Sequence, residues 1–76
     1  MKDILELVVK NLVEDKENIS INEVQNEKGI VFEVKVASTD MGKIIGKQGR
    51  LAKAIRTVIK AIAGREHKKV TIEFIG

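Results

Sequence analysis

The feature that most limits how this chain can fold is the tetrapeptide Gly-Lys-Gln-Gly at residues 46–49, which interrupts a long stretch of helical sequence. Residues 38–45 before it predict a short helix whose first three residues, Ser-Thr-Asp, are candidate N-caps. Residues 48–63 predict a longer helix, which Gly64 is placed to end as a C′ residue. Because two glycines let the backbone turn tightly, the pattern predicts two helices joined by a short turn.

The longer of these helices is amphipathic. Its apolar residues recur at helical spacing and predict one buried stripe, made up of Leu51, Ile55, Val58, Ile59 and Ile62. The basic residues Arg56 and Lys60 point away from that stripe, and we expect them to be solvated surface. In the shorter helix Ile44 and Ile45 cannot both be buried, so one of them is expected to face outward.

A further amphipathic helix is predicted at the N-terminus, over residues 3–15. Asp3 is placed to cap it, and Glu6 stands at the spacing of a capping box. One broad apolar side is predicted, formed by Ile4, Leu5, Val8, Val9 and Leu12. This side is expected to pack over the rest of the molecule.

Three segments alternate as strands do. In residues 19–24 the alternation fails at Val24, which indicates either a bulge or an edge strand. Residues 30–36 and 70–74 alternate regularly, with Ile, Phe and Val on one face. A hairpin turn at residues 26–29 joins the first two strands, with its final glycine supplying a positive φ.

The predicted order of elements is therefore α-β-β-α-α-β. The first two strands must be antiparallel, whereas a right-handed crossover through two helices suits a parallel pairing of the second and third strands. A three-stranded mixed sheet with all three helices on one face would bury every apolar stripe. The expected fold is an α+β two-layer sandwich, with residues 1–76 forming one domain.

Composition excludes several kinds of active site. The chain has no cysteine and one histidine, His67, so it has no cysteine nucleophile, zinc cluster or Ser-His-Asp triad. No paired base and nucleophile can be assembled, so we expect neither an enzyme nor a metal or cofactor. No apolar run is long enough to span a membrane. Asp3 and Glu6 interrupt the apolar stretch that a signal peptide needs, which predicts a cytoplasmic protein.

The charged residues are distributed unevenly along the chain. Residues 1–40 hold five basic and nine acidic residues, a net charge of −4, whereas residues 41–76 hold nine basic and two acidic residues, a net charge of +7. This asymmetry indicates that the second half meets an anionic partner. A solvated helix face explains the same charges equally well.

The turn at residues 46–49 has the chemistry of a phosphate-binding site. Its glycines bring backbone amides close to a ligand, the positive end of the following helix faces the same place, and Lys47 and Arg50 add charge. A Walker loop needs Gly-Lys-Ser/Thr, and a dinucleotide-binding loop needs Gly-x-Gly-x-x-Gly, and neither sequence is present. A phosphodiester backbone is the anion that best fits so extended a cradle.

The segment Ile-Gly-Lys-Gln-Gly at residues 45–49 resembles the I-G-x-x-G motif of KH domains, and the order α-β-β-α-α-β resembles their type II arrangement. More narrowly, residues 40–56 resemble the KhpA (YlqC) group of bacterial single-KH proteins. The resemblance covers essentially the whole chain. It implies binding of single-stranded RNA across about four nucleotides, with the turn clamping the backbone.

Carried over position by position, the resemblance implies a set of RNA-binding residues in the turn and on the helices beside it. The clamp would be Gly46, Lys47, Gln48 and Gly49, flanked by Lys43, Ile45, Arg50 and Lys53. The only aromatic residues, Phe32 and Phe74, are at core positions of their strands, so no aromatic platform is available for stacking. Bases would have to lie against aliphatic side chains.

The resemblance also implies partners and a physiological role. Members of the group form homodimers and pair with a larger KH protein, KhpB (Jag/EloR), and the pair is linked to RNA chaperoning and to cell division, cell elongation and cell wall homeostasis. A different hypothesis is a protein-interaction adaptor that uses the same helices for dimerisation and binds little RNA.

Overall fold

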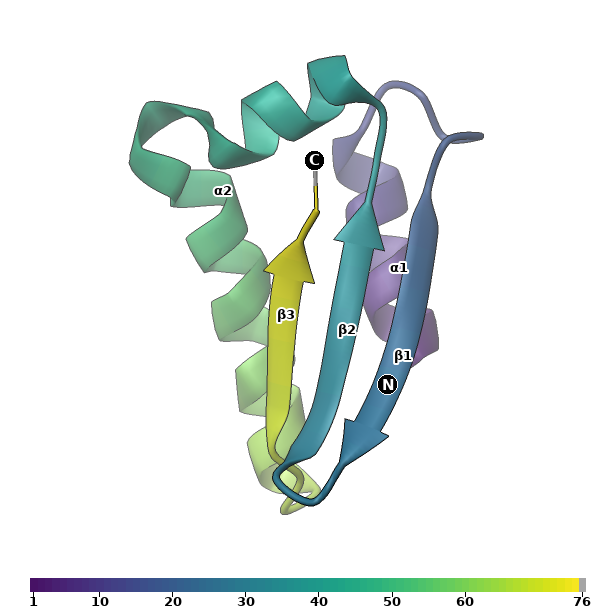
Figure 1. The fold of residues 1–76 in the computed structure, drawn as a ribbon. Helices are drawn as coiled ribbons and strands as arrows, with labels where there is room; N and C mark the ends of the chain where they lie inside the picture. The colour runs from purple at the N-terminus through teal and green to yellow at the C-terminus, as the bar shows by residue number, and fades with distance from the viewer. Residues whose placement is uncertain (76) are drawn as a thin grey trace.

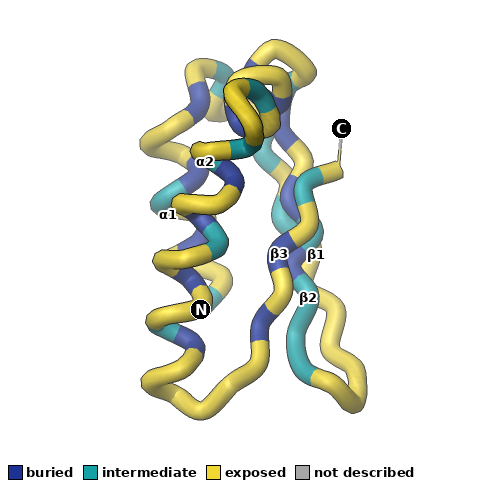
Figure 2. The backbone as a smooth tube through the Cα atoms, turned by 90° about the vertical axis from the view of Figure 1, so that its left-hand side faces the viewer, coloured by how far each residue is buried: buried dark blue, intermediate teal, exposed yellow. Residues whose placement is uncertain are grey.

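The computed structural model describes residues 1–75, which form a three-stranded sheet covered on one side by helices (Figures 1 and 2). The elements in chain order are α1 (Lys2–Leu12), β1 (Ser20–Asn26), β2 (Gly29–Lys35), α2 (Ser38–Arg65) and β3 (Val70–Phe74). Figure 2 shows the sheet at one side and both helices at the other, so the predicted two-layer α+β fold is confirmed. Where the sequence predicts two helices after β2, the structure has one element, α2, with a non-helical interruption at residues 46–49.

The sheet has the predicted topology. The strand order is β1-β2-β3, with β1 antiparallel to β2 and β3 parallel to β2. The register between Ser20 and Asn26 is continuous, so there is no bulge, and β1 is an edge strand as the alternative prediction held. Val24 breaks the alternation because it lies opposite Val31 on the outer face of the sheet, away from the helices.

The turn between β1 and β2 confirms the prediction for residues 26–29. Gly29 has a φ of 139°, and the N–H of Ile30 beside it donates to the carbonyl oxygen of Lys69 at 2.9 Å. A Cβ atom on Gly29 would lie 2.3 Å from that oxygen. Glycine is therefore required here both for its backbone angle and for the close approach of the loop before β3.

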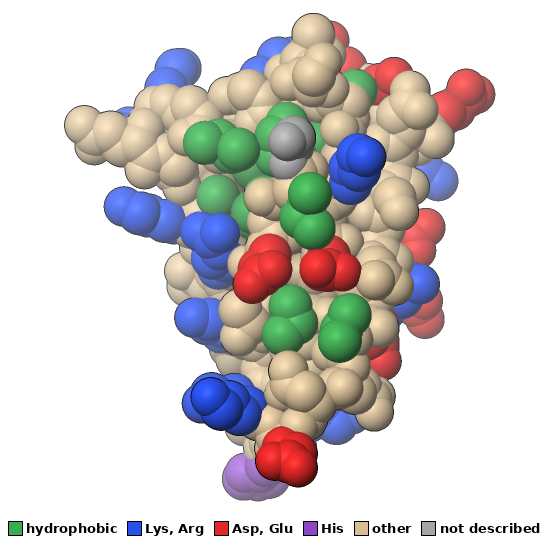
Figure 3. Space-filling view, in the orientation of Figure 1, with side chains coloured by type: hydrophobic (Ala, Val, Ile, Leu, Met, Phe, Trp, Pro, Cys, Tyr) green, Lys and Arg blue, Asp and Glu red, His purple; other side chains and the backbone are tan. Residues whose placement is uncertain are grey.

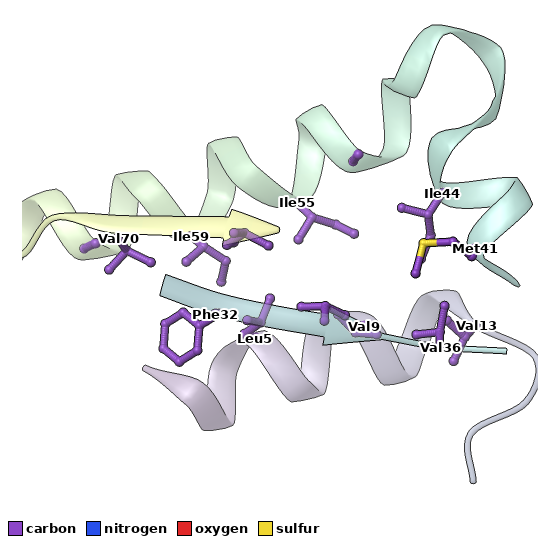
Figure 4. Packing of buried hydrophobic residues seen from close by; sticks show 14 residues of the cluster. Leu5, Val9, Val13, Phe32, Val36, Met41, Ile44, Ile55, Ile59 and Val70 are labelled. Carbon is purple, nitrogen blue, oxygen red and sulfur yellow. The ribbon is translucent and has the colours of Figure 1, made fainter. Parts of the chain in front are cut away.

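The core lies between the sheet and the helices (Figure 4). Leu5 and Val9 of α1 and Ile55 and Ile59 of α2 point toward the inner face of the sheet, where Phe32 is fully buried. The buried apolar residues are Leu5, Val9, Val13, Phe32, Val34, Val36, Met41, Ile44, Ala52, Ile55, Ile59, Ala63, Val70 and Ile72.

The buried face of α2 is rotated from the predicted one. Ala52, Ile55, Ile59 and Ala63 are buried, whereas Val58 is 46% exposed. The prediction assigned the large apolar side chains to the buried face. A helix can lie closest to a sheet where its residues are small, and the burial of Ala52 and Ala63 agrees with such a close approach. The apolar side of α1 is likewise narrower than predicted, as its buried residues are Leu5 and Val9, while Ile4 and Leu12 are exposed.

The ends of α1 differ from the prediction. The helix begins at Lys2, and the carbonyl oxygen of Met1 accepts the first backbone N–H bonds, at 3.2 Å. Asp3 therefore lies in the first turn, and no side chain caps the helix. The helix ends at Leu12 because Val13 is extended, with φ −97° and ψ 155°. In residues 1–75 neither α1 nor α2 is long and apolar enough to cross a membrane.

The end of α2 also differs from the prediction. The helix runs to Arg65, and the N–H groups of His67 and Lys68 donate to the carbonyl oxygens of Gly64 and Ala63 at 3.1 and 2.9 Å. These two bonds form a Schellman motif, in which the C′ residue takes the left-handed conformation. The C′ residue is His67, with φ 57°, whereas the sequence predicts Gly64 at that position.

Candidate functional site

The turn at residues 46–49 is the most unusual stretch of backbone in α2. Gly46 has φ −63° and ψ 170°, and the next three residues, Lys47, Gln48 and Gly49, have φ values of 52°, 64° and 69°. These angles turn the chain sharply, so the two segments of α2 meet at a corner at the upper left of Figure 1. The sequence predicts this turn correctly.

Two residues of the turn take an unfavourable backbone conformation. A left-handed conformation costs a residue with a side chain about 1 kcal/mol or more, and both Lys47 and Gln48 adopt it while exposed to solvent. Gly49 has a positive φ, which favours glycine, whereas Gly46 has a negative φ. A Cβ atom on Gly46 would meet nothing within 4 Å. The fold itself therefore gives no reason for glycine at Gly46.

A hollow of about 530 Å³ lies beside this turn. It is lined by Gly42, Lys43, Gly46, Lys47, Arg50, Leu51 and Ala54. A second hollow, of about 270 Å³, lies at the tip and is lined by Lys47, Gln48 and Arg50. The structure thus brings Lys43, Gly46, Lys47 and Arg50 around one hollow and places Gln48 at the other.

Three of the predicted site residues line neither hollow. Gly49 is half-buried within the turn, and Ile45 and Lys53 are exposed on the helical segments beside it. As expected of the isoleucine pair, one member is buried and one faces outward, because Ile44 is 1% exposed and Ile45 is 52% exposed.

Three residues of the larger hollow were not predicted as site residues. Gly42 precedes Gly46 by four positions, and Leu51 and Ala54 follow Arg50 by one and four positions. The i, i+4 spacing of Gly42 from Gly46 and of Ala54 from Arg50 is a signal that could have identified them, because such residues share a helix face. Gly42, which has no side chain, and Ala54, which has only a methyl group, leave room beside the three basic side chains.

The segment before the turn is held in place by Asp40. Its side chain is 2% exposed and accepts the backbone N–H groups of Glu14 and Asp15, at 2.9 and 3.0 Å. These bonds hold the pKa of the Asp40 carboxyl below its usual value. The N-cap of α2 is Ala37, so the expectation that Asp40 or its neighbours cap the helix is wrong, because Asp40 instead binds the chain that leaves α1.

An ion pair reinforces the same connection. Lys43 lies next to Glu14, and its ammonium donates to the Glu14 carboxylate. This hydrogen bond raises the pKa of Lys43 above its usual value. Both side chains are largely exposed, so the pair is open to solvent and to an anionic ligand.

The uneven distribution of charge along the sequence produces an uneven distribution of charged side chains over the surface of the molecule. Residues 41–65 contain seven basic residues and no acidic one. In Figure 3 Lys and Arg side chains follow the left-hand edge from top to bottom, where α2 lies, whereas acidic side chains lie in the middle of the sheet face, at its lower end and toward the opposite edge. The side that carries α2 and the turn is therefore predominantly basic.

Arg56 does not behave as solvated surface, which is where the prediction is wrong. Its Nε donates to the carbonyl oxygen of Ile72 at 3.2 Å, and its guanidinium lies over the ring of Phe74. These contacts arise because Arg56 stands on the flank of α2 that meets β3. Within residues 1–75, no group of three or more acidic or histidine side chains is placed to hold a metal ion.

Comparisons with known proteins place the chain in a family. The sequence matches the family described as "KhpA/KhpB, KH domain" over residues 2–74. It is 55% identical over 75 residues to the RNA-binding protein KhpA of Clostridium perfringens. This match covers 99% of this chain and 100% of the relative.

Other relatives agree. The RNA-binding protein KhpA of Clostridium acetobutylicum is also 55% identical over 75 residues, with 99% of this chain and 100% of the relative covered. The RNA-binding protein KhpA of Aquifex aeolicus is 43% identical over 75 residues, with 99% and 95% covered. These relatives are named as RNA-binding proteins, not as enzymes. A comparison with solved structures finds no match. With a whole-chain family match and close full-length relatives, the chain belongs to the KhpA/KhpB family of KH-domain proteins.

Proposed function

We propose that this chain is a non-enzymatic module that binds single-stranded RNA, gripping about four nucleotides at the turn of residues 46–49. One observation carries the proposal. The turn is an exposed backbone corner in which Gly46 leaves the main chain bare without structural need, and Lys43, Lys47 and Arg50 surround it. The names of the relatives, RNA-binding protein KhpA, support the same function.

Each part of the turn has a distinct role in this proposal. Phosphates approach the bare backbone at Gly46, and the N–H groups at the start of the second segment of α2 donate to them. Lys47 and Arg50 neutralise the phosphate charge at the tip, while Lys43 and Lys53 flank the strand. The left-handed conformation of Lys47 and Gln48 is kept because it aims the backbone of the turn outward.

The bases would be held by aliphatic side chains. The only two aromatic residues are unsuited to stacking, since Phe32 is fully buried and Phe74 is half-buried against the core with the Arg56 guanidinium over its ring. Ile45, Leu51 and Ala54 are the apolar surfaces next to the turn. Contacts of this kind discriminate poorly among bases, so we expect weak binding with little sequence preference.

The same proposal includes the finer description of the fold. We infer that residues 1–76 form one KH domain of type II, in which the two segments of α2, before and after the turn, act as separate helices. The backbone angles at residues 46–49, which are non-helical at all four positions, support this division.

The test is a double variant, Lys47→Asp with Gln48→Asp. Both side chains are exposed at the tip, and aspartate tolerates the left-handed conformation, so the fold should survive. We expect the affinity for a fluorescent single-stranded RNA to fall by about tenfold or more. For an RNA of four nucleotides, the wild-type affinity should depend on salt with a log–log slope of about −2, from roughly −0.7 for each of about three phosphates.

The matched control is Lys2→Asp with Asn11→Asp, which changes the net charge equally but on the exposed side of α1. It should lose little affinity. A folded double variant of the turn that binds RNA as the wild type does would overturn the proposal.

A second function, self-association, is supported by a separate observation. Apolar side chains remain exposed on the helical layer, at Ile4, Leu7 and Leu12 of α1 and Val58 of α2. Both helices lie on one side of the sheet, and these exposed apolar side chains come from both of them (Figure 2). We propose that the chain forms a homodimer and pairs with a KhpB-like KH protein, because two linked weak sites bind RNA more tightly than one.

Sizing distinguishes this function from RNA binding. Leu7→Lys with Val58→Lys should shift the protein to a monomer in light scattering while leaving RNA contact at the turn. If the chain were mainly a protein-interaction adaptor, gel shifts at two salt concentrations would show little RNA binding by the wild type, although it would still associate.

The proposed physiological role rests on the family to which the chain belongs. We propose an RNA chaperone or post-transcriptional regulator in the cytoplasm that acts with the KhpB-like partner in cell division, cell elongation and cell wall homeostasis. Deletion of the gene should then change cell length, and only a copy with an intact turn should restore it. Strand-annealing assays test the chaperone activity directly, and crosslinking in cells identifies the RNA targets.

A further inference from the structure

A third basic hollow lies at the far end of α2 from the turn. It has a volume of about 290 Å³ and is lined by Lys60, Ala63, Lys68, Lys69, Val70 and Thr71. Its three lysines come from two places in the sequence, the last turns of α2 and the loop that leads into β3. The fold therefore gathers them into one cluster.

These three lysines have no partner of opposite charge within residues 1–75. Lys60, Lys68 and Lys69 are all exposed, and none makes an ion pair or a side-chain hydrogen bond there. By contrast Lys43 is paired with Glu14. The charge of the cluster is thus available to an anionic ligand.

The surface between the turn and this cluster is also basic. Lys53, Arg56 and Lys60 follow one another at i, i+3 and i+7, which places them along one side of α2. Residues 41–65 contain no acidic residue to interrupt the row. The column of Lys and Arg side chains along the edge of Figure 3 follows the same path from top to bottom.

We propose that a single strand of RNA held at the turn continues along this edge, and that Lys60, Lys68 and Lys69 form a second phosphate-binding site at its end. The inference rests on the proposed function, because the turn anchors the strand. The helical segment from residue 50 to residue 65 rises by about 24 Å at roughly 1.5 Å per residue. Stacked nucleotides are spaced by about 3.4 Å, so the path accommodates about seven of them, more than the roughly four that the turn alone would hold.

The chemistry favours a nucleic acid over an acidic protein segment. The cations form a long single row with a periodic spacing, as the phosphates of a strand do. The apolar part of the far hollow is limited to Ala63 and Val70, and Thr71 adds a hydroxyl group. A folded protein partner would need a broader apolar surface at the centre of its interface.

The test is the dependence of affinity on RNA length. Unstructured RNAs of about four to sixteen nucleotides are titrated against the wild type and against Lys60→Gln/Lys68→Gln/Lys69→Gln. Wild-type affinity should rise up to about seven nucleotides, whereas the variant should gain little beyond about four. For the longest RNA we expect a loss of about tenfold and a salt slope shallower by about 2, from three lost contacts at roughly 0.7 each.

The matched control is Lys2→Gln/Lys10→Gln/Lys35→Gln, which removes the same charge from α1 and β2. It should keep the length dependence. In a second measurement, a photoreactive uridine placed far from the anchored end of a long RNA should crosslink to residues 60–69, and the same group on a four-nucleotide RNA should not.

Three results would overturn the inference. The first is that the triple lysine variant keeps the wild-type length dependence. The second is that the control variant loses as much affinity as the triple lysine variant. The third is that polyglutamate competes for the lysine cluster as well as unlabelled RNA does. If the wild type binds the four-nucleotide RNA and the triple lysine variant keeps the wild-type length dependence, the inference fails and the proposed function stands. If the wild type binds no RNA of any length, the proposed function itself fails.

Discussion

The guanidinium carbon of Arg56 lies 5.3 Å from the centroid of the Phe74 ring. Arg56 also donates from Nε to the carbonyl oxygen of Ile72, at 3.2 Å. Because β3 is an edge strand, that oxygen would otherwise be open to pairing with another chain. Arg56 therefore covers the edge of the sheet and holds α2 against it, in addition to any electrostatic attraction of RNA.

Replacing Arg56 by lysine tests this structural role. Lysine keeps the charge but cannot both donate to Ile72 from the same position and lie flat over the ring. We expect Arg56→Lys to lower the free energy of unfolding by about 1 kcal/mol, measured by urea denaturation. The corresponding change at an exposed position, Lys53→Arg, should have little effect, and RNA affinity should change less than twofold in both. Equal stability of Arg56→Lys and wild type would contradict the role.

Asp40 predicts a pH dependence of stability. Its pKa is lowered from the ordinary value of 3.8, chiefly by the N–H groups of Glu14 and Asp15, so the folded state favours the ionised carboxyl. Its contribution to stability is therefore complete above the ordinary pKa and is lost as the pH falls through the lowered one. Asn in its place has one oxygen for two donors, so Asp40→Asn should lower the Tm by several degrees at neutral pH.

The same variant should lose less stability than the wild type between neutral pH and pH values below 3.8. Thermal unfolding followed by circular dichroism across this range measures both effects. Asp3→Asn is the matched control, because Asp3 is exposed and caps nothing. Identical acid sensitivity in Asp40→Asn and wild type would show that other carboxyls determine it.

His67 predicts a stabilising substitution. It occupies the left-handed C′ position after α2 with φ 57°, a conformation that costs a residue with a Cβ atom about 1 kcal/mol and glycine much less. We expect His67→Gly to raise the free energy of unfolding by up to about 1 kcal/mol, seen as a higher urea midpoint. His67→Ala should give no such gain, since alanine pays the same conformational cost. A gain in both variants would mean that the imidazole itself is unfavourable.

The fold could be predicted from sequence wherever a pattern depended on neighbours along the chain. The alternation in residues 30–36 and 70–74 and the glycine at Gly29 identified the strands and the hairpin, and the crossover rule determined their parallel pairing. The errors arose where distant segments decide. Ala52 and Ala63 are buried instead of Val58 because the sheet packs against their side of α2. The spacing of apolar residues in the sequence does not indicate how closely the sheet approaches the helix.

The candidate site shows the same division. The turn and its cations could be predicted because they are consecutive in the sequence. The role of Asp40 could not, since its partners, Glu14 and Asp15, lie about 25 residues earlier and are backbone groups that any residue provides. The lysine cluster at Lys60, Lys68 and Lys69 was likewise invisible as a site, because the Schellman turn brings its two parts together.

The two glycines of the turn separate structure from function most directly. Gly46 has backbone angles that any residue adopts and open space for a Cβ atom, so Gly46→Ala should leave the free energy of unfolding within about 0.5 kcal/mol or raise it slightly. If phosphates approach the bare backbone there, the added methyl group meets the ligand, and the affinity for RNA should fall by about tenfold. Gly49 has φ 69°, so Gly49→Ala should instead cost about 1 kcal/mol of stability.

The measurement pairs urea denaturation with RNA titration for both variants. A Gly46→Ala protein with full stability and weakened binding is the result that only a ligand-contacting glycine produces. If Gly46→Ala keeps both stability and affinity, the strand does not approach the backbone at this point, and the grip must come from the side chains of Lys47 and Arg50 alone. That outcome would move the RNA from the corner of α2 to its charged tip, where the second hollow lies.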